Sequence, residues 1–508
     1  MNVLLAIDLG TEGARVGAFD SAGRLLADAH EGYDTVFPRP GWAEQDPEDW
    51  WRATVRAARA VLAQEAVVRA GAIVGISVAA TASTVVVLDS AGRPLRPAIL
   101  WMDSRAWAEA AETGNYAEAH PVLAYSGAID SAEWLVPKAM WLARHEPRTY
   151  TQAHRVVESV DYLTWRLTGR WVASRMNATC KWNYDSQEGR FPTELYADLG
   201  IPELTEKLPT DVLPVGEPAG TLQRSAARDL GVTGSPVVAT GGIDAHVSLL
   251  ACGPQVDGLV SVVAGTSTAF ITEVSEPLHA ASIWGPYPHA LREGRWLLEG
   301  GQLSSGSVLG WLSQAVMGIP RNDLAALIHA AHDVRPVQHG LLVLDNFMGN
   351  RTPHRDPRLR GAVLGLTLGT TPPELYRACV EAVCLGTRNV LESWIEAGVP
   401  IDRIVLSGGI RHNPLWLATT VDVLARPVEL VEDDNLTLRS GAVQAAYAAG
   451  LFADMATAIS AYAPVTRTLD PDPRPTAEYD DAYRRYVTAT VALREQLHEL
   501  ADVAAHRG

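Results

Sequence analysis

Two segments about half a chain apart repeat one plan, in which an apolar strand, a Gly-Thr turn and a second strand follow one another. The first reads AIDLGTEGARVGAF at residues 6–19, and the second reads LVSVVAGTSTAFITE at residues 259–273. Such a repeat predicts two related domains that face each other. The length of 508 residues agrees, because it exceeds what one hydrophobic core serves comfortably. We expect the boundary near residues 240–258, where four glycines interrupt the pattern.

Local signals predict several elements. Residues 3–26 read as a strand meander with tight glycine turns. Asp46 is placed as an N-cap, with Pro47 at the first helical position. Apolar spacing predicts one helix over residues 376–396 and a terminal helix over residues 479–500, docked by a stripe of tyrosines and leucines.

Charge and composition exclude several classes of protein. The formal net charge is −17 and no basic block occurs, which argues against binding to nucleic acid or an anionic membrane surface. No apolar run approaches a membrane span, and the acidic Asp8 comes too early for a signal peptide. The four cysteines show neither C-x-x-C nor zinc spacing, so we expect free thiols in the reducing cytoplasm.

The two Gly-Thr turns are candidate phosphate sites. DLGTEGAR (8–15) places a carboxylate at a strand end, followed by a turn whose N–H groups and Thr11 hydroxyl can donate to phosphate. Asp8 can hold Mg²⁺ through water. AGTST (264–268) is a similar turn, and one turn in each domain would clamp a polyphosphate from both sides. The alternative for each is an ordinary hairpin turn. A P-loop motif is absent from the sequence.

GGIDAH (241–246) delivers Asp244 from a glycine-rich strand end, where it can enter a cleft. A carboxylate there can accept the proton of an attacking hydroxyl. The alternative is an N-cap for the following helix. We expect His246 to be structural, because a lone His beside a helix start usually is.

Two further segments carry polar groups suited to a small polyol. CKW (180–182) holds Lys181, one of three lysines in the chain, beside a Trp. LEGGQLSSG (298–306) holds Glu299, which can accept hydrogen bonds from hydroxyls, or which is instead a solvated loop carboxylate.

SGGIRHN (407–413) fits a nucleotide platform. Gly408 and Gly409 allow close backbone approach to a base or ribose, and Asn413 can hydrogen-bond it. The alternative for this segment is a strand-to-helix turn.

The order of these motifs resembles the FGGY carbohydrate kinases over roughly residues 3–450. The segments that carry the resemblance are DLGTEGAR, WMDSRA, VPKAMW, DYLTWRLTG, GGIDAH, AGTS, GAVLGLTLGTTPPELYRACVE and SGGIRHN. It implies an α/β fold of two ribonuclease-H-like domains of the actin and Hsp70 ATPase type, with ATP and sugar in the cleft between them. On this basis we expect a sugar-binding domain over residues 1–245, a nucleotide-binding domain over 246–455 and a helical tail over 456–508.

The resemblance also implies residue roles. Asp244 would be the catalytic base and Asp8 would serve Mg²⁺. The nucleotide and its phosphates would be bound by Thr11, Arg15, Thr266, Gly306, Gly408, Gly409 and Asn413.

Within the family, the chain looks most like ribulokinases, through AATAS (79–83), CKW, LEGGQ and GNRTPHRDPRLRGAVLGLTL (349–368). Carried over by position, the sugar site would comprise Ala80, Lys181, Asp244 and Glu299. Two departures matter. Ala79 stands where ribulokinases usually carry Asp, and Gly13 stands where many members have Ser or Thr. The first leaves the substrate open, and the second removes a hydroxyl near phosphate.

The expected activity is transfer of the γ-phosphate of ATP to a hydroxyl of a small ketose, a pentulose such as ribulose. The alternatives are a xylulokinase-like or polyol (ribitol or erythritol) kinase and a non-metabolic ATPase of the same superfold. A homodimer is common among such relatives.

Overall fold

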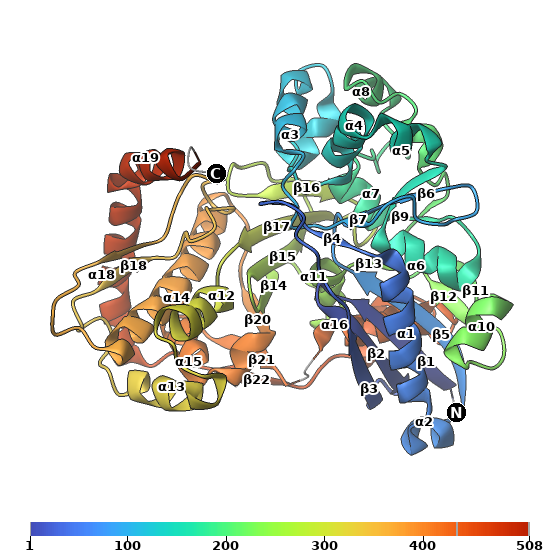
Figure 1. The fold of residues 1–508 in the computed structure, drawn as a ribbon. Coiled ribbons are helices and arrows are strands. Elements are labelled where there is room, and N and C mark those ends of the chain that lie inside the picture. The colour runs from blue at the N-terminus through green and yellow to red at the C-terminus, as the bar shows by residue number, and fades with distance from the viewer. Residues whose placement is uncertain (1, 433–434, 506–508) are drawn as a thin grey trace.

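The computed structural model describes residues 2–432 and 435–505, and they form two lobes side by side (Figure 1). Each lobe is built on one seven-stranded sheet with helices packed against it. The expected pair of α/β domains is therefore present.

The N-terminal sheet begins with the predicted meander, in which β1, β2 and β3 pair antiparallel. β5 then pairs parallel with β1 on the other side, and β12 and β13 pair parallel with β5. The bounds of its strands are β1 Asn2–Leu9, β2 Gly13–Asp20, β3 Leu25–Gly32, β5 Ala72–Ala80, β11 Pro218–Thr221, β12 Val237–Ala239 and β13 Gly242–Ile243.

The C-terminal sheet repeats this arrangement. β14 pairs antiparallel with β15, β15 with β17, and β20 lies parallel to β14, as β5 does to β1. The internal repeat predicted from the two Gly-Thr turns is thus confirmed. Its strands are β14 Leu259–Ala264, β15 Thr268–Val274, β16 Trp284–Pro288, β17 Trp296–Gln302, β20 Arg403–Ser407, β21 Val428–Val431 and β22 Thr466–Leu469.

An accessory region is inserted between β5 and β11. It has its own core, which includes Leu135, Met140 and Trp182. The small sheets and helices between β3 and β11 are β4 Glu44–Gln45, α1 Pro47–Leu62, α2 Glu65–Ala70, β6 Val85–Leu88, β7 Ala98–Ile99, α3 Trp107–Thr113, α4 Leu135–His145, α5 Pro147–Gln152, β8 Arg155–Glu158, α6 Ser159–Thr168, β9 Ala173–Ser174, α7 Arg175–Lys181, α8 Thr193–Asp198, α9 Leu204–Lys207 and β10 Val212–Leu213.

The predicted start of α1 is confirmed, because the Asp46 side chain accepts a hydrogen bond of 2.9 Å from the Glu48 amide. The predicted helix at 376–396 is confirmed within α14 Pro372–Glu396. The remaining helices and strands are α10 Arg224–Leu230, α11 Asp244–Val247, α12 Gly306–Gly310, α13 Leu324–His332, β18 Leu342–Leu344, β19 Ala362–Leu364, α15 Pro414–Leu424, α16 Leu436–Ala448, α17 Met455–Ala461, α18 Pro473–Ala492 and α19 Arg494–Ala505.

The tail differs from the single helix expected. It forms two helices, α18 and α19, after contributing β22 to the edge of the C-terminal sheet. Tyr479, Tyr486 and Leu497 of the predicted stripe are buried. Because the chain turns after Leu493, Leu500 leaves the stripe and is exposed.

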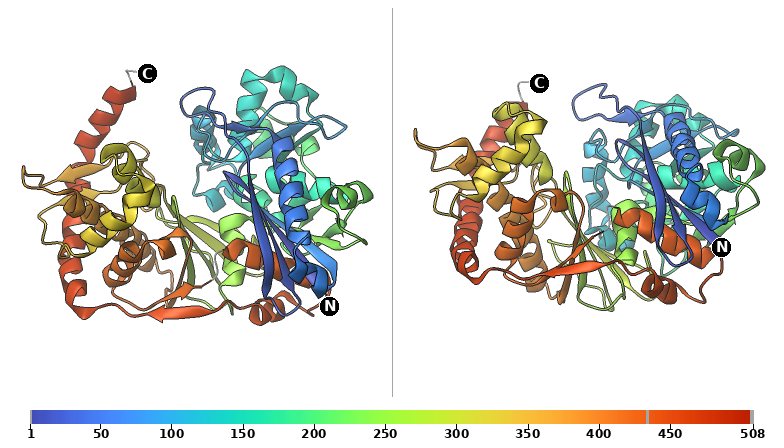
Figure 2. Two further views of the ribbon diagram at one scale, coloured as in Figure 1. Left: turned by 60° about the horizontal axis from the view of Figure 1, so that its bottom comes forward. Right: turned by 90° about the horizontal axis from the view of Figure 1, so that it is seen from below.

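One helix crosses from the late chain to the early sheet. α16 packs against β1 and β5, so it covers one face of the N-terminal sheet (Figure 2). The packing is close: a Cβ added at Gly75 of β5 would lie 2.4 Å from the carbonyl oxygen of Ala445. The residues around this contact belong to a core cluster that also includes Ile271 and Val405 of the other sheet. It joins the two lobes.

No helix in the described part of the chain is long and apolar enough to cross a membrane.

We predict that Gly75→Ala destabilises the protein, because its methyl group would push α16 off the sheet. The expected loss is about 1–3 kcal/mol in the free energy of unfolding, measured by denaturant titration. Gly114→Ala is the matched control, since Gly114 has φ of −60° and its nearest neighbour lies at 3.5 Å. Equal stability of the two variants would contradict the close contact.

Candidate active site

A cavity of about 320 Å³ lies between the lobes and is lined from both. Five predicted site residues line it together, namely Thr11, Lys181, Asp244, Thr266 and Glu299. They come from segments as far apart as the β1–β2 turn and β17. The rest of the lining includes Thr81, Ala82, Ser83, Trp101, Glu133, Trp134, His246, Gly265, Ser267 and Arg351.

Asp8 and Asp244 form an acidic pair at the strand ends of the N-terminal lobe. Asp8 is buried near the end of β1 and accepts a hydrogen bond of 3.1 Å from the Asn435 side chain. Burial raises the pKa of Asp8, while Asn435 and Arg15 act to lower it. Burial, and then the charge of Asp8, raises the pKa of Asp244 to about 7. The base candidate is therefore poised near neutral pH.

The backbone explains how Asp244 reaches the cavity. β13 pairs with the end of β5, and α11 starts at Asp244 directly after it. Asp244 is thus the first residue of this short helix, and Ile243 occupies the N-cap position. Its carboxylate accepts the amide of Ala245 at 2.7 Å.

The two Gly-Thr turns line the cavity from different lobes. The Thr11 hydroxyl accepts a hydrogen bond of 3.0 Å from the Trp101 indole, and the Gln45 side chain donates to the Thr11 carbonyl at 2.7 Å. In the other turn, the Thr266 carbonyl accepts the amides of Ser305 and Ser307, both at 3.1 Å. Both turns are held by neighbours before any ligand arrives.

Glu299 is the centre of a buried charge cluster on β17. Its carboxylate pairs with Lys181 at 3.0 Å, with His246 at 3.2 Å and with Arg351. Burial alone would raise the pKa of Glu299, but the charges of Lys181 and Arg351, together with the contact from His246, hold it well below its usual value. Glu299 is therefore not the solvated loop carboxylate that the sequence left open.

His246, which the sequence leads us to expect as a structural residue, is buried beside Glu299. It lines the cavity and contacts Glu299, and burial lowers its pKa below the usual value. Asp244 and His246, two residues apart in GGIDAH, both line the cavity.

Ala80 lies outside the lining. It is fully buried at the end of β5, where it pairs with Leu9 and Ile243. The next three residues, Thr81, Ala82 and Ser83, line the cavity instead. Because Ala80 has no exposed surface, the loop that follows it lines the cavity and Ala80 does not.

Three of the predicted nucleotide residues, Gly306, Gly408 and Gly409, are not part of the cavity lining. Gly408 has φ of +93°, and a Cβ there would lie 2.6 Å from the carbonyl oxygen of Ala264. A Cβ at Gly306 would meet the carbonyl oxygen of Gly265 at the same distance. These glycines pack directly under the second Gly-Thr turn. Gly409 begins a short 3₁₀ helix over Gly409–His412.

Asn413 and Arg15 are likewise not part of the cavity lining. The Asn413 side chain caps α15 by accepting the Trp416 amide at 3.1 Å, and it also contacts the Tyr376 hydroxyl at 3.1 Å. The strand-to-helix turn that the sequence left open is therefore formed. Arg15 is exposed on β2, directly across from Asp8.

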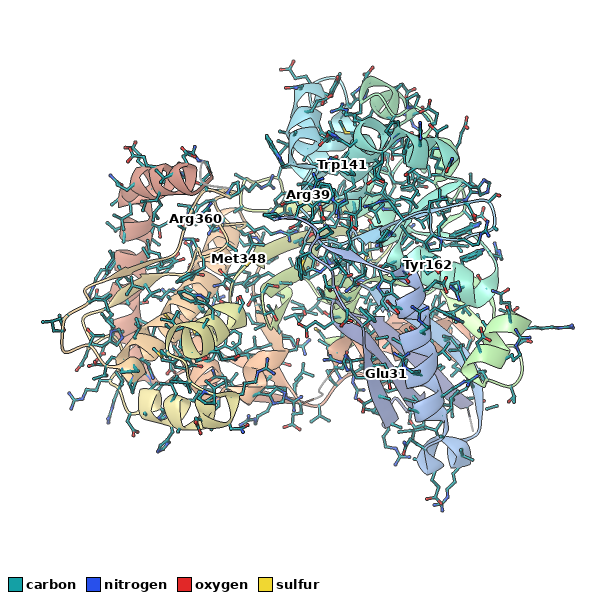
Figure 3. The ribbon with its side chains drawn as sticks, in the orientation of Figure 1. Glu31, Arg39, Trp141, Tyr162, Met348 and Arg360 are labelled. Atoms are coloured by element: carbon teal, nitrogen blue, oxygen red, sulfur yellow. The ribbon has the colours of Figure 1, made fainter. Side chains whose placement is uncertain are left out.

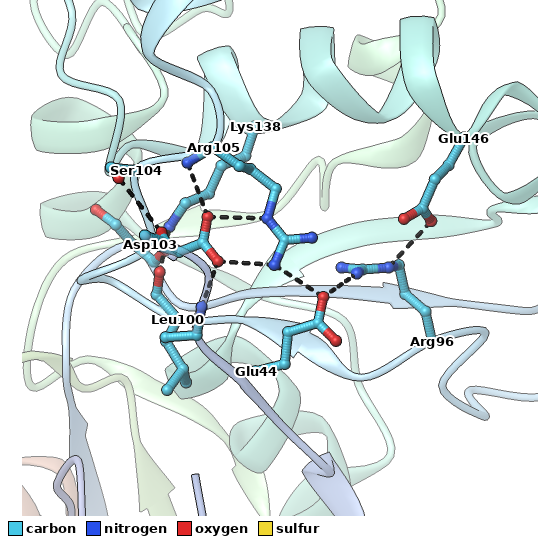
Figure 4. Close-up of polar contacts among 11 residues, drawn as sticks. Glu44, Arg96, Leu100, Asp103, Ser104, Arg105, Lys138 and Glu146 are labelled. Carbon is cyan, nitrogen blue, oxygen red and sulfur yellow. Dashed lines mark hydrogen bonds and ion pairs between the residues drawn. The ribbon is translucent and has the colours of Figure 1, made fainter. Parts of the chain in front are cut away.

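A buried ionic network supports the wall of the cavity (Figure 4). Lys138 donates to the backbone carbonyls of Ser83 and Leu100, each at 2.7 Å. Asp103 and Arg105 pair beside it at 2.7 Å with no exposed side-chain surface. Burial lowers the pKa of Lys138 to about 7. The network fixes Ser83 and the strand end that leads to Trp101, two parts of the lining.

Sequence reasoning missed Trp101, Glu133, Trp134 and Arg351 as individual lining residues. Three signals were present, because WMDSRA contains Trp101, VPKAMW follows Trp134 and GNRTPHRDPRLRG contains Arg351. Each motif was recognised as a whole, without a way to tell which side chain faces inward.

Comparison with known proteins decides the family. Residues 3–251 match the N-terminal domain, and residues 260–449 the C-terminal domain, of the FGGY family of carbohydrate kinases. The chain belongs to this family. It is therefore a carbohydrate kinase, with ATP as the phosphoryl donor of the family.

Similar proteins extend over nearly the whole kinase. The FGGY carbohydrate kinase domain-containing protein of Homo sapiens is 29% identical over 98% of both chains. A ribulokinase of Mycolicibacterium smegmatis is 29% identical over 95% of this chain and 92% of its own. The xylulose kinase structure from Rhodospirillum rubrum superposes with a TM-score of 0.84 at 28% identity, over 98% of this kinase and 100% of that chain. The expected fold is confirmed.

The acidic pair predicts a pH-dependent gain in stability for Asp244→Asn. The pKa of Asp244 is raised from 3.8 to about 7 on folding, so the native state binds more protons between these values and its stability falls as pH rises through this window. Removing the carboxyl removes that cost. The melting temperature of Asp244→Asn should therefore exceed that of the unaltered kinase at pH 8, and the gap should close toward pH 4.

Asp28→Asn, at an exposed aspartate of β3, is the control. A gap that stays constant with pH would refute the raised pKa.

Proposed function

We propose that this kinase transfers the γ-phosphate of ATP to a hydroxyl of a pentulose such as ribulose, with Asp244 as the general base. One observation carries the proposal. Asp244 lies in a single cavity with two Gly-Thr turns suited to phosphate and with the Lys181–Glu299 pair suited to a polyol.

The substrate class follows from the polar lining around Lys181 and Glu299, which we call the sugar end of the cavity. A carboxylate and an ammonium group side by side can accept from and donate to neighbouring hydroxyls, which suits a short polyhydroxylated chain. Two relatives named by substrate, the ribulokinase of M. smegmatis and the xylulose kinase of R. rubrum, support a pentulose. A xylulose or pentitol substrate is the second candidate, because Ala79 leaves out the acidic side chain usual in ribulokinases.

Asp244 supplies the proton acceptor. In phosphoryl transfer the transition state is loose, so catalysis depends mostly on positioning and on charge stabilisation. A carboxylate with a pKa of about 7 can orient the sugar hydroxyl and take its proton as the new bond to phosphorus forms. The hydroxyl oxygen then carries the phosphoryl group, and ADP leaves with the electron pair of the broken bond.

The donor set fits Mg²⁺. Mg²⁺ usually takes one or two protein carboxylates and completes its shell with water and substrate phosphates. Asp8 provides such a carboxylate, and no cluster of three His, Cys, Asp or Glu groups able to hold a metal occurs in residues 2–432 and 435–505. Asp8 would hold the ion through water. When bound, Mg²⁺ would neutralise phosphate charge.

A coupled assay of ADP release across pentuloses and pentitols tests the function. We expect sugar-dependent turnover with at least one pentulose, and a loss of about 10²–10⁴-fold in kcat for Asp244→Asn, with ATP binding retained. Near-normal turnover in that variant would remove Asp244 from the base role. ADP release that does not respond to any sugar or polyol would favour a simple ATPase.

The pH profile gives a separate prediction. Because Asp244 must be unprotonated to accept a proton, kcat/KM for the sugar should rise with pH through about 7 and then level off. The residual activity of Asp244→Asn should lack this rise. If both proteins share the same acidic limb, another group sets it.

A further inference from the structure

A loop of the C-terminal lobe reaches across to the N-terminal lobe at the sugar end of the cavity. We call residues 349–358 the bridging loop; it lies within the GNRTPHRDPRLRG motif, whose role the proposed reaction leaves unassigned. Met348 and Arg360, labelled in Figure 3, flank it on the C-terminal lobe. Within it, Arg355 contacts the carbonyl oxygen of Gly127 in the other lobe at 3.5 Å.

Arg351 is the member of the loop that enters the cavity. Its guanidinium pairs with Glu299 of its own lobe, and its second terminal nitrogen lies 3.8 Å from Glu133 of the other lobe. The Arg351 side chain is only 18% exposed and that of Glu299 only 7%. A planar fork can serve two carboxylates at once, which an ammonium group cannot do as well.

Aromatic rings complete the crossing. Arg355 lies 4.2 Å and Arg351 5.4 Å from the ring centroid of Trp284. Trp284 in turn meets Trp134 of the other lobe edge to face, with ring centroids 5.6 Å apart. Trp134 lines the cavity, and its indole N–H is buried without a hydrogen-bond partner. The lobes thus touch through groups that belong to, or directly back, the sugar end of the cavity.

The bridging loop is anchored from behind. Asn350 and Asp356 exchange backbone hydrogen bonds of 2.7 and 2.9 Å. The Asp356 carboxylate then binds Arg494 at 2.9 Å and His498 at 2.8 Å, both on or at the start of α19. The position of Arg351 is therefore set by the fold rather than by a free loop.

We propose that Arg351 is a positioning residue that ties sugar recognition to the contact between the lobes. It orients the Glu299 carboxylate toward the substrate, and through Glu133 it makes the same guanidinium part of the interlobe contact. The inference rests on the proposed function, because it takes Glu299 as a sugar ligand. Sugar affinity then depends on Glu133, a residue of the opposite lobe.

The experiment compares Arg351→Gln, Glu133→Gln and the double variant, with Arg360→Ala as control. Arg360 is close by in sequence, but among the described residues it hydrogen-bonds the local carbonyls of Pro357 and Leu359. We expect Arg351→Gln to raise the sugar KM at least about tenfold, and Glu133→Gln to raise it less, with the KM for ATP unchanged in both. The double variant should be no worse than Arg351→Gln alone, because both single changes break one interaction.

Arg351→Lys separates charge from geometry. It keeps a cation for Glu299 but loses the fork, so its sugar KM should fall between those of the unaltered kinase and Arg351→Gln. Sugar binding measured by calorimetry without ATP should follow the same order.

Each failure has its own signature. If the unaltered kinase and Arg360→Ala phosphorylate no pentulose or pentitol, the proposed function fails. If they are active and Glu133→Gln leaves the sugar KM unchanged, or the effects of the single changes simply add, the coupling by Arg351 is overturned. Equal changes in both KM values with a lowered melting temperature would also overturn it, since they indicate a structural role alone.

Discussion

Two carboxylates held together in a buried cleft are the constraint on which the rest of this kinase depends. Asp8 lies on β1 and Asp244 directly follows β13 of the same sheet, and the charge of one opposes ionisation of the other. Such a pair costs folding free energy, which the surrounding sheet and α16 must offset. That cost is a mark of function, because the pair becomes favourable only when positive charge or a proton arrives.

The surroundings of Glu299 in the same cavity follow the reverse principle. Glu299 meets Lys181, His246 and Arg351, so its charge is balanced before any ligand enters. A balanced and hydrogen-bonded carboxylate keeps one orientation, which favours selection among hydroxyl arrangements. The acidic pair is thus electrostatically unsatisfied and reactive, and the Glu299 cluster is satisfied and selective.

Much of this was predictable from sequence. The repeat of a Gly-Thr turn between strands predicted two similar sheets, because the geometry of a hairpin depends on the residues of its own turn. Thr11 and Thr266, which line the cavity from these turns, followed from the repeat, and Asp244 followed from the glycine-rich strand end GGIDAH. Ala80 was misplaced, since a shift of one or two residues at a strand end decides between burial and a loop. Arg351 was missed because its partners, Glu133 and Glu299, lie far away in sequence and meet it only through the fold.

The placement of α16 has a consequence for folding during synthesis on the ribosome. The first strands of the N-terminal sheet leave the exit tunnel early, but α16, the helix that covers β1 and β5, begins at Leu436 and is synthesised much later. At synthesis rates of about 5–20 residues per second, one apolar face stays open for on the order of ten seconds or more. Nascent chains therefore expose an apolar face of the N-terminal sheet until α16 is made and covers it. During this interval that face is available to chaperones.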